Sequence, residues 1–545
     1  MKLIFYPAFI VIGLWLSVQT ATAKWYEASG EHFVIYADDS EDDVREFATN
    51  LERYHAALKI LYKFGDKPPP SPSNRVTIYV TNSESAVAKL AGSDGKNVSG
   101  FYIPRAGGSI AFTPPVQKYR PTASGGRAPK NSAGSAPPDF SQTVLLHEYA
   151  HHFMISNLSF SLPLWFSEGF AEYVGSTSFG KGGTVGLGRP AIHRAGELNF
   201  AKSVPWKLLF DTKAYRKYKE KRSSFDSFYG QSWALFHYLQ STEETRKLRD
   251  DYIARLARGE GELKSAVDTF GDLDKFGNKI ERYVTGGLYY TNIPADWLSF
   301  KPVTLRELSA GEAAIMPVVM QSRRGVNREQ AAKLVPEART IAAKFPGDAA
   351  VLAALAEAEY DAGNDDAAIT AADQATAIQP ANINAMLQKG YALFRKARDA
   401  EGKDADDKKA AFSAVRKHFT AINKIEKDHP IPLIYFYRTY FDQGVEPTEN
   451  AKNALDYALQ LSPFDKGLRL NVARQDMKDK RYAEARDHLW ILANDPHRTE
   501  PSDGRPDPIT AMLKEAEEKL GIAQDDGDDT DGQDSGEEGN VATNS

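Results

Sequence analysis

Cysteine is absent from this sequence of 545 residues. The absence excludes disulfide bonds, thiolate ligands for a metal ion and a thiol nucleophile. It also excludes the attachment of a lipid to a cysteine near the N-terminus. Any metal centre in this chain must therefore rely on histidine and carboxylate ligands.

A strong excess of charge of either sign is also lacking. The 67 Lys and Arg residues nearly balance the 73 Asp and Glu residues, for a formal net charge of -6. A group of the acids crowds into the C-terminal tail: Asp525, Asp526, Asp528, Asp529, Asp531, Asp534, Glu537 and Glu538. Without them the chain is close to neutral, with no broad Lys and Arg surface to displace counterions from phosphates. We therefore expect no nucleic-acid partner, and a C-terminal segment 499–545 that ends in an acidic disordered tail.

Long apolar runs are scarce, and the one at the N-terminus is short. Lys2 precedes an apolar run over residues 3–16, and Ala21-Thr22-Ala23 follows it. This three-part pattern is typical of a secretory signal peptide over residues 1–23, cut near Ala23. The alternative is an uncleaved anchor helix, but so short a run spans a bilayer poorly. We expect an exported protein, in a bacterial periplasm or secreted, with no transmembrane domain in the mature chain; the lack of disulfides favours the periplasm.

The next part of the chain reads as an α+β domain over residues 24–291. Residues 25–38 alternate and are rich in β-branched and aromatic side chains, which predicts a strand or hairpin. A helical pattern follows over 40–64, and a second strand is expected at 75–82. The segments "NVSGFYIP" and "GSIAFTPP" predict a hairpin at a sheet edge.

Residues 114–139 consist largely of Pro, Gly, Ser, Ala and Lys and have almost nothing apolar to bury. We expect a flexible loop there. Because it directly precedes a histidine-rich stretch, it is either a tolerated insertion or a lid over that stretch.

The C-terminal half is rich in alanine and has a repeating pattern. Prolines close successive helical segments at intervals of about 33 or 34 residues, with one interval lengthened by a charged insertion; they are Pro346, Pro380, Pro430, Pro463 and Pro496. Small residues stand where two helices would cross, as at Ala356, Ala368 and Ala375, and Gly363 stands at the turn. The pattern resembles the tetratricopeptide repeat (TPR). We expect TPR-like repeats over 346–498, preceded by a helical linker or partial repeat over 292–345; the alternative is a non-repetitive helical domain.

The stretch "TVLLHEYAHHFMI" carries the most specific chemical signal. His147 and His151 are four residues apart, so on a helix they lie on one face and can bind one metal ion. Glu148 lies one step round the helix, close enough to reach a water on that ion. Burying imidazole and carboxylate without partners would be costly, so the apolar flanks favour a ligand role.

A third ligand is needed, and the segment "LPLWFSEGFAEYV" offers Glu168 on a second helix that begins near Pro163. Here the chain resembles the gluzincins, zinc peptidases of the peptidase MA-like group. The resemblance implies one Zn²⁺ ion bound by His147, His151 and Glu168, with Glu172 orienting His147 from behind.

The resemblance extends to "FYGQSWALFHYL", where it implies that Tyr229 stabilises the oxyanion. The residues after this tyrosine depart from the family's pattern. The family's aminopeptidases also carry a glutamate on an edge strand for the substrate's amino group, and the matching segment "GSIAFTPP" has no acid. An edge strand can still pair with an extended peptide, so the sequence favours an endopeptidase.

The sequence therefore predicts a zincin-like α+β metallopeptidase domain followed by an all-α TPR-like solenoid. Its expected reaction is hydrolysis of a protein or peptide substrate, with Glu148 as general base and Tyr229 as a second catalytic residue. The repeats would bind a protein partner. The alternative is a catalytically silent scaffold or adaptor in the cell envelope. His152 points away from His151 and is expected to pack or to support a ligand from behind. His193 lies outside the ligand spacing and is expected to be a surface residue or a core histidine with its hydrogen bonds satisfied.

Overall fold

The N-terminal domain is built on a mixed sheet of six strands. The computed structural model describes residues 24–62, 68–92, 98–115, 140–158, 160, 162–220, 225–400, 405–495, 498 and 507–522. The strands run in the order β4-β5-β3-β2-β1-β9. Their bounds are β1 Trp25–Ser29, β2 Phe33–Asp38, β3 Val76–Val80, β4 Phe101–Ile103, β5 Ile110–Thr113 and β9 Thr304–Glu307. The β2-β3 and β3-β5 pairs are parallel, and the other pairs are antiparallel.

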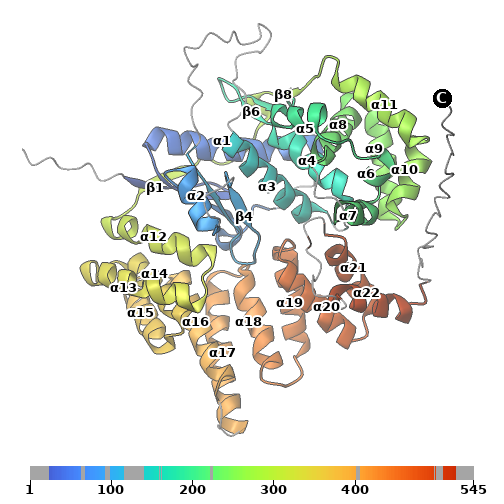
Figure 1. Cartoon of the computed structure of the whole chain (residues 1–545). Coiled ribbons are helices and arrows are strands. Elements are labelled where there is room, and N and C mark those ends of the chain that lie inside the picture. The colour runs from blue at the N-terminus through green and yellow to red at the C-terminus, as the bar shows by residue number, and fades with distance from the viewer. Residues whose placement is uncertain are drawn as a thin grey trace, which may run out of the picture.

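Successive side chains of the sheet point to opposite faces, and each face is covered by its own apolar cluster. Ile35 and Ile78 face the main core, which also contains residues of α1 (Glu41–Tyr62) and α3 (Phe140–Asn157). Tyr79 and Phe112 face a second cluster beneath α2 (Glu84–Ala91) and α12 (Ala310–Arg324). The first helix of the C-terminal half therefore seals the sheet of the N-terminal half (Figure 1).

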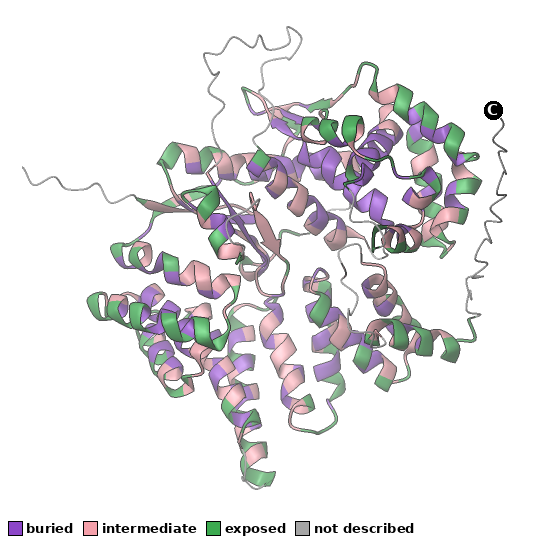
Figure 2. Ribbon diagram, in the orientation of Figure 1, coloured by how far each residue is buried: buried purple, intermediate pink, exposed green. Residues whose placement is uncertain are grey.

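Most of the remaining N-terminal domain is helical. Its helices are α4 Leu164–Gly175, α5 Ala195–Phe200, α6 Trp206–Leu209, α7 Thr212–Glu220, α8 Phe228–Ser241, α9 Glu243–Ala257, α10 Glu262–Phe270 and α11 Leu273–Val284. A small antiparallel sheet joins β6 Ser178–Phe179, β7 Val185–Leu187 and β8 Thr291–Ile293. Every residue of α4 is buried, which makes this helix the centre of the domain (Figure 2).

The C-terminal half is a stack of helices in which each packs on the next (Figure 1). The helices are α12, α13 Arg328–Lys344, α14 Ala349–Ala362, α15 Asp365–Ile378, α16 Ile383–Arg398, α17 Ala405–Ile425, α18 Pro430–Phe441, α19 Glu449–Leu461, α20 Lys466–Lys478, α21 Tyr482–Ala493 and α22 Pro508–Lys519. Helix α14 also packs on α12 and α16, so corresponding helices of neighbouring pairs touch, as in TPR arrays. The predicted TPR-like region is confirmed at the level of fold.

Several sequence predictions need correction here. The predicted edge strand "GSIAFTPP" is β5, which lies between β3 and β4, so the edge strand is β4 instead. The predicted domain boundary at residue 291 falls within β8, and β9 completes the sheet beyond it by pairing with β1. The segment 292–345 is therefore not a helical linker. The alternative of a partial repeat fits its second part, because α12 and α13 pack on each other and on α14 and open the solenoid. Proline at 430 begins α18 rather than ending a helix.

Some predictions fall on residues outside those described. They are the signal peptide over 1–23, the loop over 114–139 apart from its first two residues, and the acidic tail. Within the described part of the chain, no helix combines the length and apolarity needed to cross a membrane.

The two halves are joined by hydrogen bonds as well as by α12. The Ala106 backbone N–H donates to Asp465 Oδ2 at 2.8 Å, and Ala106 is buried among residues of α18, α19 and α20. The Ser73 backbone N–H donates to Glu426 Oε1 at 2.9 Å. Loops of the N-terminal domain thus sit against the solenoid, which positions α19, α20 and α21 near α3 (Figure 1).

Candidate metal centre

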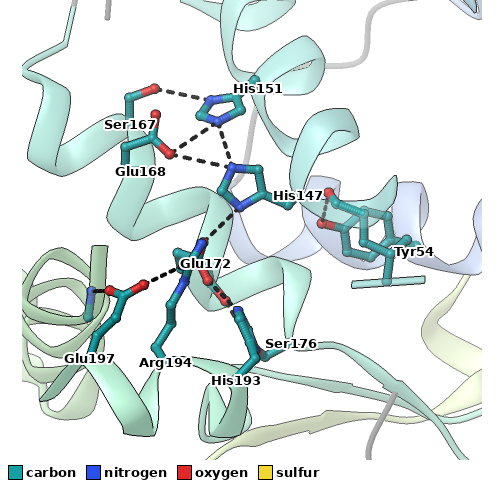
Figure 3. A network of polar contacts seen from close by, with 12 residues as sticks. Tyr54, His147, His151, Ser167, Glu168, Glu172, Ser176, His193, Arg194 and Glu197 are labelled. Atoms are coloured by element: carbon teal, nitrogen blue, oxygen red, sulfur yellow. Dashed lines mark hydrogen bonds and ion pairs between the residues drawn. The ribbon is translucent and has the colours of Figure 1, made fainter. Parts of the chain in front are cut away.

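Helices α3 and α4 bring three predicted ligands together. His147 and His151 are one turn apart on α3, and Glu168 stands in the second turn of α4 (Figure 3). Gly175 permits the two helices to approach, because a Cβ atom there would lie 3.3 Å from the Cβ of His147. The close packing fixes where the carboxylate of Glu168 meets the imidazoles.

The three ligand atoms form a nearly equilateral triangle. His147 Nε2 and His151 Nε2 are 3.1 Å apart, and Glu168 Oε2 lies 3.4 Å from the first and 3.6 Å from the second. Tetrahedral Zn²⁺ with ligand bonds of about 2.0 to 2.1 Å spaces its ligands about 3.3 Å apart. The donor set and its spacing therefore fit one zinc ion, and among the described residues these three form the group of His and carboxylate side chains that could hold a metal ion.

The protonation of the site is set by the two carboxylates beside His147. Burial acts to lower the pKa of His147, but hydrogen bonds to Glu168 and Glu172 outweigh it and raise this pKa to about 10. Burial acts to raise the pKa of Glu168, and the charge of His151 and the hydrogen bond to His147 hold it below its usual range. The site thus attracts a positive charge, as a proton on His147 or as a cation that displaces this proton.

The outer nitrogen of each ligand histidine is held from behind. His147 Nδ1 lies 3.2 Å from Glu172 Oε1, and His151 Nδ1 lies 3.1 Å from Ser167 Oγ. These contacts turn both Nε2 atoms toward Glu168, which is how ligand histidines are commonly oriented. The predicted contact of Glu172 with His147 is present, and Ser167 is a partner that the sequence did not indicate.

Glu172 is in turn anchored by His193 and Arg194, for which the sequence indicated no such role. His193 Nε2 lies 2.7 Å from Glu172 Oε2, and Arg194 Nη2 donates to Glu172 Oε1 at 2.6 Å (Figure 3). Arg194 also pairs with Glu197 at 2.6 Å. His193 is therefore a partly buried histidine with a hydrogen-bond partner, which was one of its two expected states, but the partner itself was not predicted. No regular spacing links it to the helix of Glu172, so the sequence carried no signal for this contact.

Tyr229 stands in the first turn of α8, beside the same network. The guanidinium carbon of Arg194 lies 4.8 Å from the centre of its ring, and Glu197 accepts a hydrogen bond from the backbone N–H of Gly230. Burial and the negative charge of Glu168 raise the pKa of Tyr229, so its hydroxyl keeps its proton at neutral pH. Tyr229 is still 38% exposed, which leaves it accessible to a substrate.

Glu148 faces a cavity that His151 also lines. It is half-buried and lies on α3 between the two ligand histidines. His152 points to a different partner, with its Nδ1 atom 2.5 Å from the hydroxyl of Tyr102. Burial lowers the pKa of His152 to about 3, so this histidine is a neutral packing residue.

A family model described as "Protein of unknown function (DUF1570)" matches residues 143–258. The matched segment contains His147, His151, Glu168, Glu172 and Tyr229. No curated protein matches the chain.

Several solved structures match part of this chain at low identity and low TM-score. One is TTC0263, a thermophilic TPR protein in Thermus thermophilus, with 16% identity and a TM-score of 0.30, covering 39% of this chain and 99% of that one. Another is pilF of Pseudomonas aeruginosa, with 13% identity and a TM-score of 0.31, covering 39% and 87%. The yeast Tom70 has 15% identity and a TM-score of 0.25, covering 57% and 58%.

Proposed function

We propose that this protein is an exported zinc-dependent metallopeptidase. The observation that carries the proposal is the triangle of His147 Nε2, His151 Nε2 and Glu168 Oε2, with sides of 3.1, 3.4 and 3.6 Å. Neutral imidazole and carboxylate are ligands that zinc prefers, and three protein ligands leave a fourth position for water or substrate. Export rests on the N-terminal sequence pattern.

The residues around the triangle supply the parts that hydrolysis of an amide needs. One zinc ion held there would act as a Lewis acid on the scissile carbonyl and would lower the pKa of water. Glu148, between the two ligands on α3, accepts the proton of the attacking water and passes it to the leaving amine. Tyr229 keeps its proton and donates a hydrogen bond to the oxygen that becomes negative. Glu172 and Ser167 hold the two imidazoles in position.

The sheet edge next to α3 supports an endopeptidase. Strand β4 ends the sheet and packs on α3, and Tyr102 of β4 contacts His152 of that helix. An extended peptide that paired with β4 would run past the metal centre. Neither β4 nor β5 contains an acid that could bind a free amino group. The substrate class we propose is therefore a protein or an internal segment of a peptide, and the helical repeats add a surface for a protein partner.

The test uses the purified full chain and three measurements. Wild type should bind one zinc ion per chain by metal analysis and cleave members of a peptide library detected by mass spectrometry. Glu148→Gln should keep the zinc and lose cleavage, while His147→Ala should lose the zinc. A wild-type chain that takes up no zinc would refute the metal centre. A chain that binds zinc but cleaves no peptide or protein substrate would favour the adaptor alternative.

A further inference from the structure

One cavity of the structure joins the candidate metal centre to the helical repeats. It has a volume of about 250 Å³ and is lined on one side by Glu148 and His151. On the other side it is lined by Phe464, Leu492 and Arg469, which belong to the solenoid. A substrate bound at the metal centre, beside Glu148 and His151, would therefore meet side chains of α20 and α21.

Most of the cavity wall is apolar. The N-terminal domain contributes side chains of α3 and of the segment after it, and the solenoid contributes side chains from the start of α20 and the end of α21. The apolar residues that line it are Met154, Ile155, Leu158, Phe160, Leu162, Phe464, Ile491 and Leu492. Such a wall suits the bulky apolar side chain of a peptide, whose burial is worth about 1.5 to 3 kcal/mol.

Arg469 is the exception in this wall. Arg469 is only 7% exposed. Its guanidinium donates to the carbonyl of Pro463 at 2.7 Å and lies 3.3 Å from His488 Nδ1, and both partners are neutral. Among the described residues, no carboxylate forms an ion pair with Arg469. Burial without a compensating anion lowers the pKa of this arginine to about 10.

Apart from Glu148 at the metal centre, the other charged residues of the cavity, Lys466 and Asp495, compensate each other. Lys466 Nζ lies 2.6 Å from Asp495 Oδ2, so that carboxylate is already paired. A buried guanidinium without a negative partner costs free energy in the folded protein. A ligand with a carboxylate would supply the missing negative charge and offset this cost, because a guanidinium binds a carboxylate through two parallel hydrogen bonds.

We propose that the cavity is a substrate subsite shared by both domains, in which Arg469 binds a carboxylate of the peptide next to an apolar side chain. This inference rests on the proposed metallopeptidase function and extends it by giving the repeats a part in substrate selection. The carboxylate is either the C-terminus of the peptide or an acidic side chain.

The binding test measures by calorimetry the affinity of three zinc-binding hydroxamates for the zinc-loaded full chain. Acetohydroxamate probes the metal alone. Two larger hydroxamates share one phenylpropyl side chain and differ in a single group, a carboxylate in one and a carboxamide in the other. Wild type should bind the carboxylate compound at least about tenfold more tightly than the carboxamide compound.

The variants assign that preference to one residue. Arg469→Gln should abolish the preference and leave the affinity for acetohydroxamate unchanged, while Arg469→Lys should retain part of it. Arg474→Gln is the matched control, since Arg474 is an exposed arginine of the same helix outside the cavity. The thermal midpoint of Arg469→Gln should not fall, because the substitution removes an uncompensated buried charge. A large fall in that midpoint would instead identify Arg469 as a structural residue and overturn the inference.

The outcomes separate this inference from the proposed function. Failure of acetohydroxamate to bind refutes the metal centre itself. Binding of acetohydroxamate without any carboxylate preference, or a preference that survives Arg469→Gln, overturns the shared subsite alone. Cleavage of peptide pairs that differ in a C-terminal acid or amide, or in an internal Glu or Gln, then identifies the source of the carboxylate; equal cleavage within both pairs counts against the inference.

Discussion

Glu172 Oε1 lies 3.2 Å from His147 Nδ1, on the side of the imidazole that faces away from Glu168 and His151. The same carboxylate contacts His193 at 2.7 Å and Arg194 at 2.6 Å. One buried acid thus connects a proposed metal ligand to residues between α4 and α8. The relationship gives Glu172 a role that affects metal binding without direct ligation.

Glu172→Gln should weaken zinc binding without abolishing it. The amide keeps the shape of the side chain but loses the charge that orients and polarises His147. Loss of such a partner typically costs about 10- to 100-fold in metal affinity. Competition with a chromophoric chelator measures this change, and Glu168→Gln, which alters a direct ligand, should have a larger effect. Equal zinc affinity in Glu172→Gln and wild type would contradict this role.

Tyr229→Phe should reduce turnover and leave the zinc content unchanged. The hydroxyl is the only group removed, and loss of one oxyanion donor typically lowers kcat by about 10² to 10³. Steady-state kinetics on a cleaved peptide, together with metal analysis, checks this prediction. Tyr238→Phe on the same helix is the control, because Tyr238 contacts Phe276 and Tyr283 rather than the metal centre. Unchanged kcat in Tyr229→Phe would remove Tyr229 from the catalytic residues.

Gly169→Ala should destabilise the N-terminal domain. A Cβ atom at Gly169 would lie 2.4 Å from the backbone oxygen of Ser232, so α4 and α8 would have to separate. Overpacking of this kind costs about 1 to 3 kcal/mol. Urea denaturation measures the loss. Gly196→Ala is the matched control, since Gly196 is an exposed position of α5 with nothing within 4 Å of the added atom, and it should be neutral or slightly stabilising.

Asp361→Asn should stabilise the solenoid at pH 8 but not at pH 4. Burial and the charge of Glu357 raise the pKa of Asp361 to about 7. The folded state therefore holds this proton more tightly than the unfolded state, so wild-type stability falls as the pH rises from about 4 to about 7. The asparagine variant avoids this loss, which for a pKa raised by about three units is on the order of 4 kcal/mol. Urea denaturation at both pH values tests the prediction, with the exposed Glu337→Gln as control; the same difference at pH 4 and pH 8 would refute it.

The local part of the candidate site was predictable from the sequence. His147 and His151 share a face because the helical period places residues four apart one above the other. The same period places Glu148 one step round the helix, and the helix that begins at Leu164 made Glu168 a candidate for the third ligand. The TPR-like half was predictable for a related reason, since each helix pair must bury the same small residues against the next.

Tertiary packing decided the rest, because it joins segments that share no period. His193 and Arg194 meet Glu172 only after the chain has folded α5 and α8 against α4. Strand β9 joins β1 across the whole N-terminal domain, which is why the boundary at residue 291 was wrong. Arg469 lines the cavity of Glu148 and His151 from a distant repeat. The sequence by itself determined which side chains can bind a metal and which helices repeat. The tertiary structure decided what surrounds the candidate metal centre, because burial and long-range contacts depend on the packing of whole elements.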